Sequence, residues 1–267
     1  MNLRLTFYAM AITLASTAQQ KEGTIMYQKR TNMHRTINND QMKAMMPEFR
    51  DSKHQLLFSD SISVYKLIPE DEAPDPFSGG NGGGMVIRMG GGADAGELFK
   101  NFALAKSIQS NEVGGKNFLI TDSIKQPGWK LTDETKKIAG YTCYKATMKM
   151  PAPIRRMMTI STNGNKTDSS SQVTTPKMID VVAWFTTSIP VPAGPDTYGQ
   201  LPGAILEVDV DNGLSIITAT EVKTAANKKE LQEPKKGKVV TRAEYQKMMM
   251  EMMGGQGGGM MFRSREN

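Results

Sequence analysis

Apolar and polar residues alternate along much of the chain with the two-residue period that is typical of β-strands. The clearest runs cover residues 23–28, 55–58, 61–67, 116–122, 141–150 and 178–187. Within the last of these, residues 181–185 are apolar without a break, which is expected of a strand that is covered on both faces. The pattern therefore predicts a mainly β protein.

A β-hairpin is predicted at residues 204–222. Asp211-Asn212-Gly213 separates two apolar runs there, and Asn and Gly tolerate the positive φ angles that tight turns require. Pro202 lies just before the first run, as expected of a residue that has no N–H to donate within a strand.

Signals for helices are few. Residues 39–46 predict a short helix that Pro47 ends. Thr241 and Glu244 have the spacing of a capping box, in which each side chain satisfies the backbone N–H of the other residue. A second helix is therefore expected to run from there to Met253, where Gly254 and Gly255 would end it.

The first 18 residues are typical of a secretory signal peptide, with Arg4 before an apolar run over residues 5–14 and small residues at 16–18. That run is shorter than the roughly 20 residues that a membrane-spanning helix needs, and no later run is apolar enough. We therefore expect export to the periplasm or cell envelope and no transmembrane segment.

The remaining chain is expected to form a single β domain over residues 19–240. Gly-rich and Ser-rich stretches predict flexible insertions near residues 70–95 and 160–176, because such chain loses much conformational entropy on folding. Residues 241–267 form a C-terminal segment rich in Met and Gly.

The formal net charge is +6, and the basic residues are scattered except for a cluster at Lys235, Lys236 and Lys238. Binding to nucleic acid is not expected of an exported chain that lacks a recognition motif. A soluble surface with a small positive excess is the simpler interpretation, and weak attraction to anionic membrane surfaces is the alternative.

Candidate catalytic groups are sparse. The chain has two histidines, His34 and His54, and no Gly-x-Ser-x-Gly motif. Its one cysteine, Cys143, cannot form an internal disulfide, and its alternating surroundings favour a small buried residue over a nucleophile. No helix with a Lys-Ser/Thr pair follows the glycines of residues 79–92, as a phosphate loop would require. We therefore expect a protein that is not an enzyme, with an exported hydrolase as the least favoured alternative.

Methionine is unusually frequent, at 21 of 267 residues. Thioether sulfur is a soft ligand that suits Cu(I), so an alternative function is copper binding by the C-terminal methionines, at Met248, Met250, Met252 and Met253. No other cofactor is expected. The competing interpretation is that these residues make adaptable packing or partner contacts.

The most distinctive stretch is Tyr-Gly-Gln-Leu-Pro-Gly-Ala-Ile-Leu-Glu at residues 198–207, which follows Ile-Pro-Val-Pro-Ala-Gly-Pro at residues 189–195. We call residues 189–203 the signature loop; its candidate site residues are Gly194, Pro195, Tyr198, Gly199, Leu201, Pro202 and Gly203. Together with residues 129–143 and 182–186, this stretch resembles the GLPGLI family, exported proteins of Gram-negative bacteria without an established activity. Gln200 stands where that family usually has Gly, and Ala204 where it usually has Leu.

The resemblance implies a long turn between two core strands, although loops on a rigid scaffold can also bind partners. Residues 201–211 are further similar to the periplasmic lipoprotein carriers, half-barrels that hold acyl chains against helices. We therefore expect a curved antiparallel sheet or half-barrel with few short helices. Its expected function is to bind an apolar ligand such as a lipid, or an envelope partner protein, with Trp184, Phe185, Leu206 and Val208 in its core or binding face.

Overall fold

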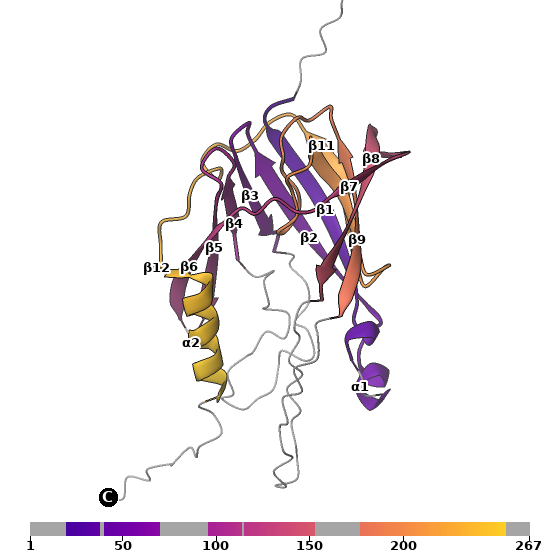
Figure 1. Cartoon of the computed structure of the whole chain (residues 1–267). Helices are drawn as coiled ribbons and strands as arrows, with labels where there is room; N and C mark the ends of the chain where they lie inside the picture. Colours follow the sequence, from indigo (N-terminus) through magenta and orange to yellow (C-terminus); the bar gives the residue numbers. More distant parts are fainter. Residues whose placement is uncertain (1–19, 38–39, 70–95, 114, 153–176, 255–267) are drawn as a thin grey trace, which may run out of the picture.

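A single curved sheet of 12 strands dominates the computed structural model, which describes residues 20–37, 40–69, 96–113, 115–152 and 177–254 (Figure 1). The strand order is β12-β6-β5-β4-β3-β2-β1-β11-β10-β9-β8-β7. Neighbouring strands run antiparallel except β12 and β6, which are parallel. The predicted mainly β fold with a curved antiparallel sheet is therefore confirmed. The signal-peptide region and the two predicted insertions lie largely or wholly outside the described residues.

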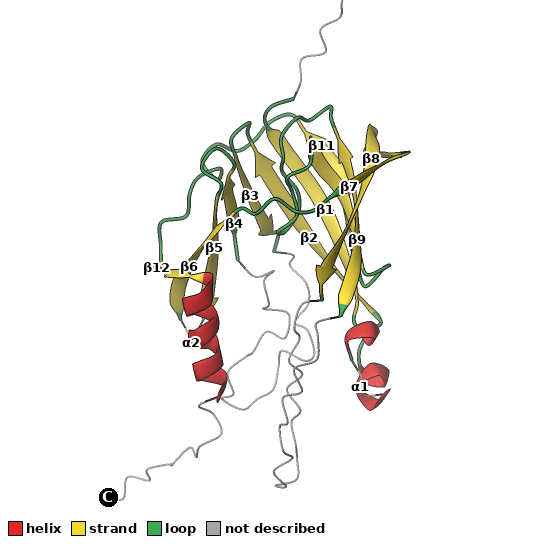
Figure 2. Ribbon diagram, in the orientation of Figure 1, coloured by secondary structure: helices red, strands yellow, loops and turns green. Residues whose placement is uncertain are grey.

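The strands and helices have the following bounds (Figure 2). The strands are β1 (Gly23–Asn32), β2 (Phe49–Phe58), β3 (Ile62–Leu67), β4 (Leu98–Asn101), β5 (Lys106–Val113), β6 (Lys116–Ser123), β7 (Lys130–Ile138), β8 (Tyr141–Pro151), β9 (Met178–Thr186), β10 (Ala204–Val210), β11 (Ser215–Lys223) and β12 (Lys238–Thr241). The α-helices are α1 (Asp40–Met45) and α2 (Arg242–Gly254).

The predicted hairpin is present as β10 and β11, with Val210 opposite Ser215. Asp211, Asn212 and Gly213 have φ angles of 50°, 49° and 86°, so the turn uses the left-handed conformations that its sequence favours. The N–H of Gly213 donates to Oδ1 of Asp209 at 2.6 Å, which closes the turn from within.

The prediction that β9 is covered on both faces is wrong. Val181, Ala183 and Phe185 are buried, whereas the alternate residues Val182 and Trp184 are half-buried. Strand β9 lies between β10 and β8, and its second face is only partly covered. An unbroken apolar run therefore marks a central strand here without marking two covered faces.

Helix α2 packs on the sheet beside β12. Tyr245 and Met248 contact a cluster formed by Phe118, Ile120 and Val240, and the guanidinium of Arg242 donates to Asp122 at 2.7 Å. The start of the predicted Met-rich segment is therefore part of the folded structure. Among the described residues, no helix is both long and apolar enough to cross a membrane.

The predicted capping box at the start of α2 is confirmed. The N–H of Thr241 donates to the Glu244 carboxylate at 2.7 Å, and the N–H of Glu244 donates to Oγ1 of Thr241 at 3.2 Å. Replacing Thr241 with alanine is expected to destabilise the protein by about 1 kcal/mol, because one helix N–H loses its acceptor. Urea unfolding measures this change, and Thr241→Ser, which keeps the hydroxyl, is expected to stay close to wild type.

Candidate functional site: the signature loop on the inner face of the sheet

The signature loop joins β9 to β10 and lies against the sheet in the concave space that faces the viewer in Figure 1. We call this side of the sheet the inner face. Ile189, Val191 and Ala193 are each at most 1% exposed. They belong to one cluster with residues of the first four strands, namely Ile25, Tyr27, Leu56, Phe58, Tyr65 and Leu98. The loop therefore supplies part of the core over strands that are far from its own ends.

The loop folds back on itself into two limbs. The N–H of Gln200 donates to the carbonyl of Pro192 at 3.0 Å, and the N–H of Ile205 donates to that of Ala193, also at 3.0 Å. A turn closed by the N–H of Tyr198 and the carbonyl of Pro195 joins the limbs. These bonds give the loop a defined shape although it contains no strand.

Lys100 of β4 holds the tip of the loop. Its Nζ donates to the carbonyl oxygens of Asp196 at 2.7 Å and Tyr198 at 2.8 Å. In the strand order β4 lies five positions from β10, so the loop crosses the faces of four intervening strands to reach it. Lys100 is only 6% exposed, and burial lowers its pKa to about 8, although the charge of Asp196 acts in the opposite direction.

Two further side chains hydrogen-bond to the loop on the side away from the sheet. The indole N–H of Trp129 donates to the carbonyl of Gly199 at 3.0 Å, and the amide of Gln126 donates to that of Gln200 at 3.3 Å. Both residues belong to the connection between β6 and β7, which crosses the front of the sheet in Figure 1. The loop is thus enclosed between the sheet and this connection.

Three glycines of the loop are required by close approach of the backbone. A Cβ at Gly203 would lie 2.0 Å from the carbonyl oxygen of Thr186. One at Gly194 would lie 2.9 Å from the carbonyl oxygen of Tyr198, and one at Gly199 would lie 2.9 Å from that of Pro192. These glycines therefore serve packing, as the structural interpretation of the signature expects.

The backbone also accounts for the family's usual glycine at position 200. Gln200 has a φ of 64°, a left-handed conformation that glycine adopts without the strain imposed by a Cβ. Ala204, at the other position where the chain differs from the family, is fully buried and pairs with Thr186 of β9. The turn is thus formed with both departures in place.

The candidate residues of the loop differ in exposure. Gly194, Pro195, Gly199, Leu201 and Gly203 are buried, Tyr198 is half-buried, and Pro202 is exposed. Burial raises the pKa of the Tyr198 hydroxyl well above its usual value, and the charge of Asp196 raises it further. The loop thus offers backbone groups that are already paired and few side chains suited to chemistry, which supports a structural role.

The predicted burial of Cys143 is confirmed, since it is fully buried on β8. Burial raises its pKa to about 11, mainly through loss of solvation. The thiolate is the reactive form of cysteine, so this residue is a poor nucleophile near neutral pH.

Sequence reasoning missed a polar cluster around His54. Its Nε2 lies 3.0 Å from Oγ of Ser52, and its ring stacks on that of Tyr65, with 5.1 Å between the centroids. His54 is 1% exposed. The polar run at residues 50–54 hid this part of the strand, because exposed Asp51 and Lys53 alternate with half-buried Ser52 and buried His54, none of which is apolar. His34 lies apart from the cluster, with Nε2 2.9 Å from the carbonyl oxygen of Met46.

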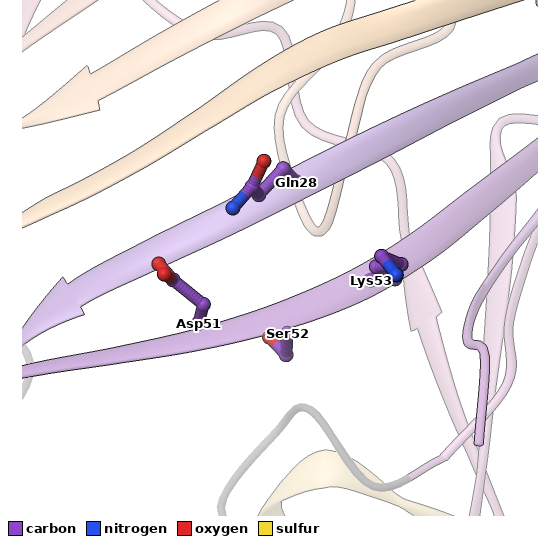
Figure 3. Close-up of a pocket in the computed structure, with 4 residues that line it drawn as sticks. All are labelled: Gln28, Asp51, Ser52 and Lys53. Atoms are coloured by element: carbon purple, nitrogen blue, oxygen red, sulfur yellow. The ribbon is translucent and has the colours of Figure 1, made fainter. Parts of the chain in front are cut away.

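Near this cluster, a hollow of about 230 Å³ lies between β1 and β2 and is lined by Gln28, Asp51, Ser52 and Lys53 (Figure 3). In Figure 3, Gln28 and Asp51 extend into the gap between the two strands, whereas Ser52 lies on the other side of the β2 ribbon. The carboxylate of Asp51 forms an ion pair with Arg30, with Nε of Arg30 2.9 Å from Oδ1 of Asp51. All four lining residues have polar side chains, and these side chains do not converge on one point.

Of the four methionines predicted to bind copper, the structure describes the side chain of Met248 alone. It packs against the Phe118 cluster. The backbone of residues 242–254 is helical, and helix positions two residues apart, such as 248 and 250, do not share a face. In the ranges that the structure describes, no three His, Cys, Asp or Glu residues are grouped as a metal site would require. Copper binding stays a prediction.

The fold defines a class of protein, a curved antiparallel sheet whose inner face is covered by its own chain. Two crystal structures of PNGF-II, in space groups C2 and P21, share this fold with TM-scores of 0.51 and 0.50 and 16% sequence identity. The alignments cover 86% of this chain but only 33% and 34% of the PNGF-II chain. This chain thus spans about a third of the length of those proteins.

A protein-family model also matches part of the chain. It describes a protein of unknown function, Porph_ging, and matches residues 129–207. The match begins at Trp129 and contains the whole signature loop, so it covers the segments on which the sequence resemblance rests. No curated protein matches the chain.

Proposed function

We propose that this chain is a non-enzymatic binding module of the cell envelope that recognises a partner protein at the β7 edge of its sheet. The observation that carries the proposal is the position of the signature loop. The loop covers the inner face over four strands with buried side chains and is tied there by Lys100. Recognition is therefore assigned to an edge of the sheet and not to its concave face.

The same observation disfavours the alternative, an apolar ligand held in the concave face. In a half-barrel carrier that face must stay open to accept an acyl chain. Here Ile189, Val191 and Leu201 are at most 3% exposed and pack within the core. Displacing them for a ligand would expose apolar area at a cost of about 1.5–3 kcal/mol for each large side chain.

The β7 edge has features that suit strand addition. Strand β7 is the last strand of the sheet order, and an edge strand offers backbone groups to an extended segment of a partner. Leu131 and Tyr144 are 57% and 40% exposed. Leu131 lies opposite Ala146, and Tyr144 is two residues before Ala146 on the same face. Leu131 would lie next to an added strand, and Tyr144 would lie one strand further in on the same face.

The similarity in fold to PNGF-II also supports the proposal that this chain is a module. The curved sheet of this chain corresponds to about a third of the PNGF-II chain, so the fold occurs there beside further sequence. The buried state of Cys143 and of His54 supports the expectation that the chain is not an enzyme. Export by the signal peptide at residues 1–18 would place the module in the envelope.

Site-specific cross-linking tests the proposal in the cells that produce the protein. A photoreactive amino acid placed at Leu131 or Tyr144 is expected to give a discrete protein adduct. The same group at Met45, which is 67% exposed on α1, is the matched control and is expected to give none. Equal adducts at all three positions would show that the β7 edge is not a specific site.

Native mass spectrometry of the gently purified protein separates the two ligand classes. The bare protein mass is expected, because the signature loop already packs on the apolar inner face over β1–β4. A bound mass in the lipid range that survives purification would overturn the proposal and restore the carrier interpretation.

A further inference from the structure

The connection from β11 to β12 lies against the face of the sheet opposite to the signature loop, which we call the outer face. Leu231 of this connection is 9% exposed and packs against a cluster on β2–β6, formed by Leu57, Val64, Phe99, Ile108 and Leu119. In Figure 1 the connection leaves β11 at the top of the view and descends on the left to β12. Its backbone is thus fixed on the sheet.

The two glutamates of this connection are paired with lysines of the sheet. Glu230 lies 2.7 Å from Nζ of Lys66, and Glu233 lies 2.9 Å from Nζ of Lys106. The side chain of Asn227 also donates to Glu230, at 2.6 Å. Both carboxylates of the segment are therefore neutralised by contacts with the protein itself.

The lysines at this connection are exposed. We call them the basic strip: Lys228, Lys229, Lys235, Lys236 and Lys238. Two acidic groups interact with these lysines: Glu22, which lies 3.7 Å from Lys228, and Glu244, whose pKa is lowered in part by the charge of Lys238. Five lysines against these two carboxylates leave the strip with a clear positive excess.

Two exposed apolar side chains come from elements that adjoin the connection. Val239 follows Lys238 in the edge strand β12, so its side chain lies on the opposite face from Lys238; Val239 is 64% exposed and Leu104 is 70% exposed. Leu104 lies in the turn before Lys106, the residue that holds Glu233. Lysines next to exposed apolar side chains are typical of protein surfaces that meet a lipid interface.

We propose that the basic strip binds anionic lipid headgroups at a membrane surface, with Val239 and Leu104 reaching the interface. An acidic protein would match the lysines but leave the role of the two apolar side chains unexplained, which favours lipid. This inference concerns the β12 edge of the sheet and the connection that leads to it, and it does not depend on a partner at the β7 edge.

Vesicle co-sedimentation tests the proposal. The protein is mixed with vesicles of phosphatidylcholine alone or with roughly 30% phosphatidylglycerol. Binding is expected only with the anionic lipid and is expected to be lost near 0.5 M salt, where the Debye length falls to a few ångströms. The triple variant K235E/K236E/K238E is expected to bind at least about tenfold more weakly, since each lysine near an anionic surface contributes a favourable term.

The matched control is K130E/K137E/K149E, which makes the same charge change on exposed lysines of β7 and β8. It is expected to bind anionic vesicles within about twofold of wild type. Thermal melts check that both variants remain folded. Equal weakening by the two variants, or equal binding to neutral vesicles, would overturn the proposal. So would binding to soluble poly-glutamate, with the same dependence on the strip, in place of vesicles.

Discussion

Replacing Gly203 with alanine is expected to destabilise the protein by about 4 kcal/mol or more, the largest effect of any single change considered. The new Cβ would lie 2.0 Å from the carbonyl oxygen of Thr186 and 2.7 Å from its carbonyl carbon. Both are backbone atoms of β9, so no side-chain rotation relieves the clash. Strands β9 and β10 must then separate at the point where Thr186 pairs with Ala204.

Urea unfolding of the variant measures this loss, which would take up much of the 5–15 kcal/mol that stabilises a typical domain. Gly128→Ala is the matched control, because a Cβ at that position meets no atom within 4 Å. It is expected to change the free energy of unfolding by less than about 0.5 kcal/mol. A Gly203→Ala protein within 1 kcal/mol of wild type would show that the ends of the two strands can move apart at little cost.

The second large effect is expected at Lys100. Lys100→Met fills similar space but leaves the carbonyl oxygens of Asp196 and Tyr198 without their donor. We expect a loss of about 2 kcal/mol at pH 7, because buried acceptors that lose a partner are costly. Lys106→Met, at a 40% exposed lysine with a surface ion pair, is the control and is expected to cost less than about 1 kcal/mol.

The contribution of Lys100 is also expected to depend on pH. Its pKa is about 8 in the folded protein and near 10.5 in the unfolded chain, so between these values the unfolded state binds more protons. Lys100 therefore adds stability as the pH rises from about 8 to 10.5, by up to about 3 kcal/mol. The neutral amine keeps two N–H groups for the two carbonyls.

Two other groups, Tyr198 and Cys143, change the stability in the opposite direction between pH 8 and 10.5. Burial raises the pKa of Tyr198 and of Cys143, which lowers stability as the pH rises. The difference between wild type and Lys100→Met at each pH isolates the lysine. That difference is expected to widen from pH 8 to 10.5, and a constant difference would mean that Lys100 keeps an ordinary pKa in the fold.

Local signals in the sequence predicted the elements that local chemistry determines. The turn at residues 211–213, the capping box of Thr241 and Glu244, and the short helix before Pro47 each depend on a few neighbouring residues. Strands β1, β3, β6 and β8 were predicted because one buried face imposes alternation on them, and β9 was predicted from its unbroken apolar run.

The elements that sequence reasoning missed lack that constraint. Strand β7 lies at a sheet edge, and six of its nine residues are exposed, so charged residues are tolerated at most of its positions. Strands β4 and β12 have four residues each, too few to show a period. Strand β5 carries buried Gln109 beside buried Ile108, which breaks the expected alternation.

The glycines and prolines of the signature loop predict a turn, but the side chains that hold the loop were not predictable. Lys100 is 96 and 98 residues from the two carbonyls that it holds, and Trp129 is 70 residues from Gly199. No local pattern marks Lys100 as buried, because lysine is usually exposed. Only the strand order brings β4 under the tip of the loop.

The place of β1 has a consequence for how the protein is made. The first strand to leave the ribosome pairs on one side with β2 and on the other with β11, where Thr24 lies opposite Lys223. The pairing of β1 with β11 in the middle of the sheet can form only after almost the last strand has been synthesised. Pairing over such sequence distances is slow. The consecutive strands β1–β6 and β7–β11 can each pair with their chain neighbours as they are made, but the two halves join only through β1 and β11. Closure of the sheet at this pair is therefore expected to be the late, slow step of folding.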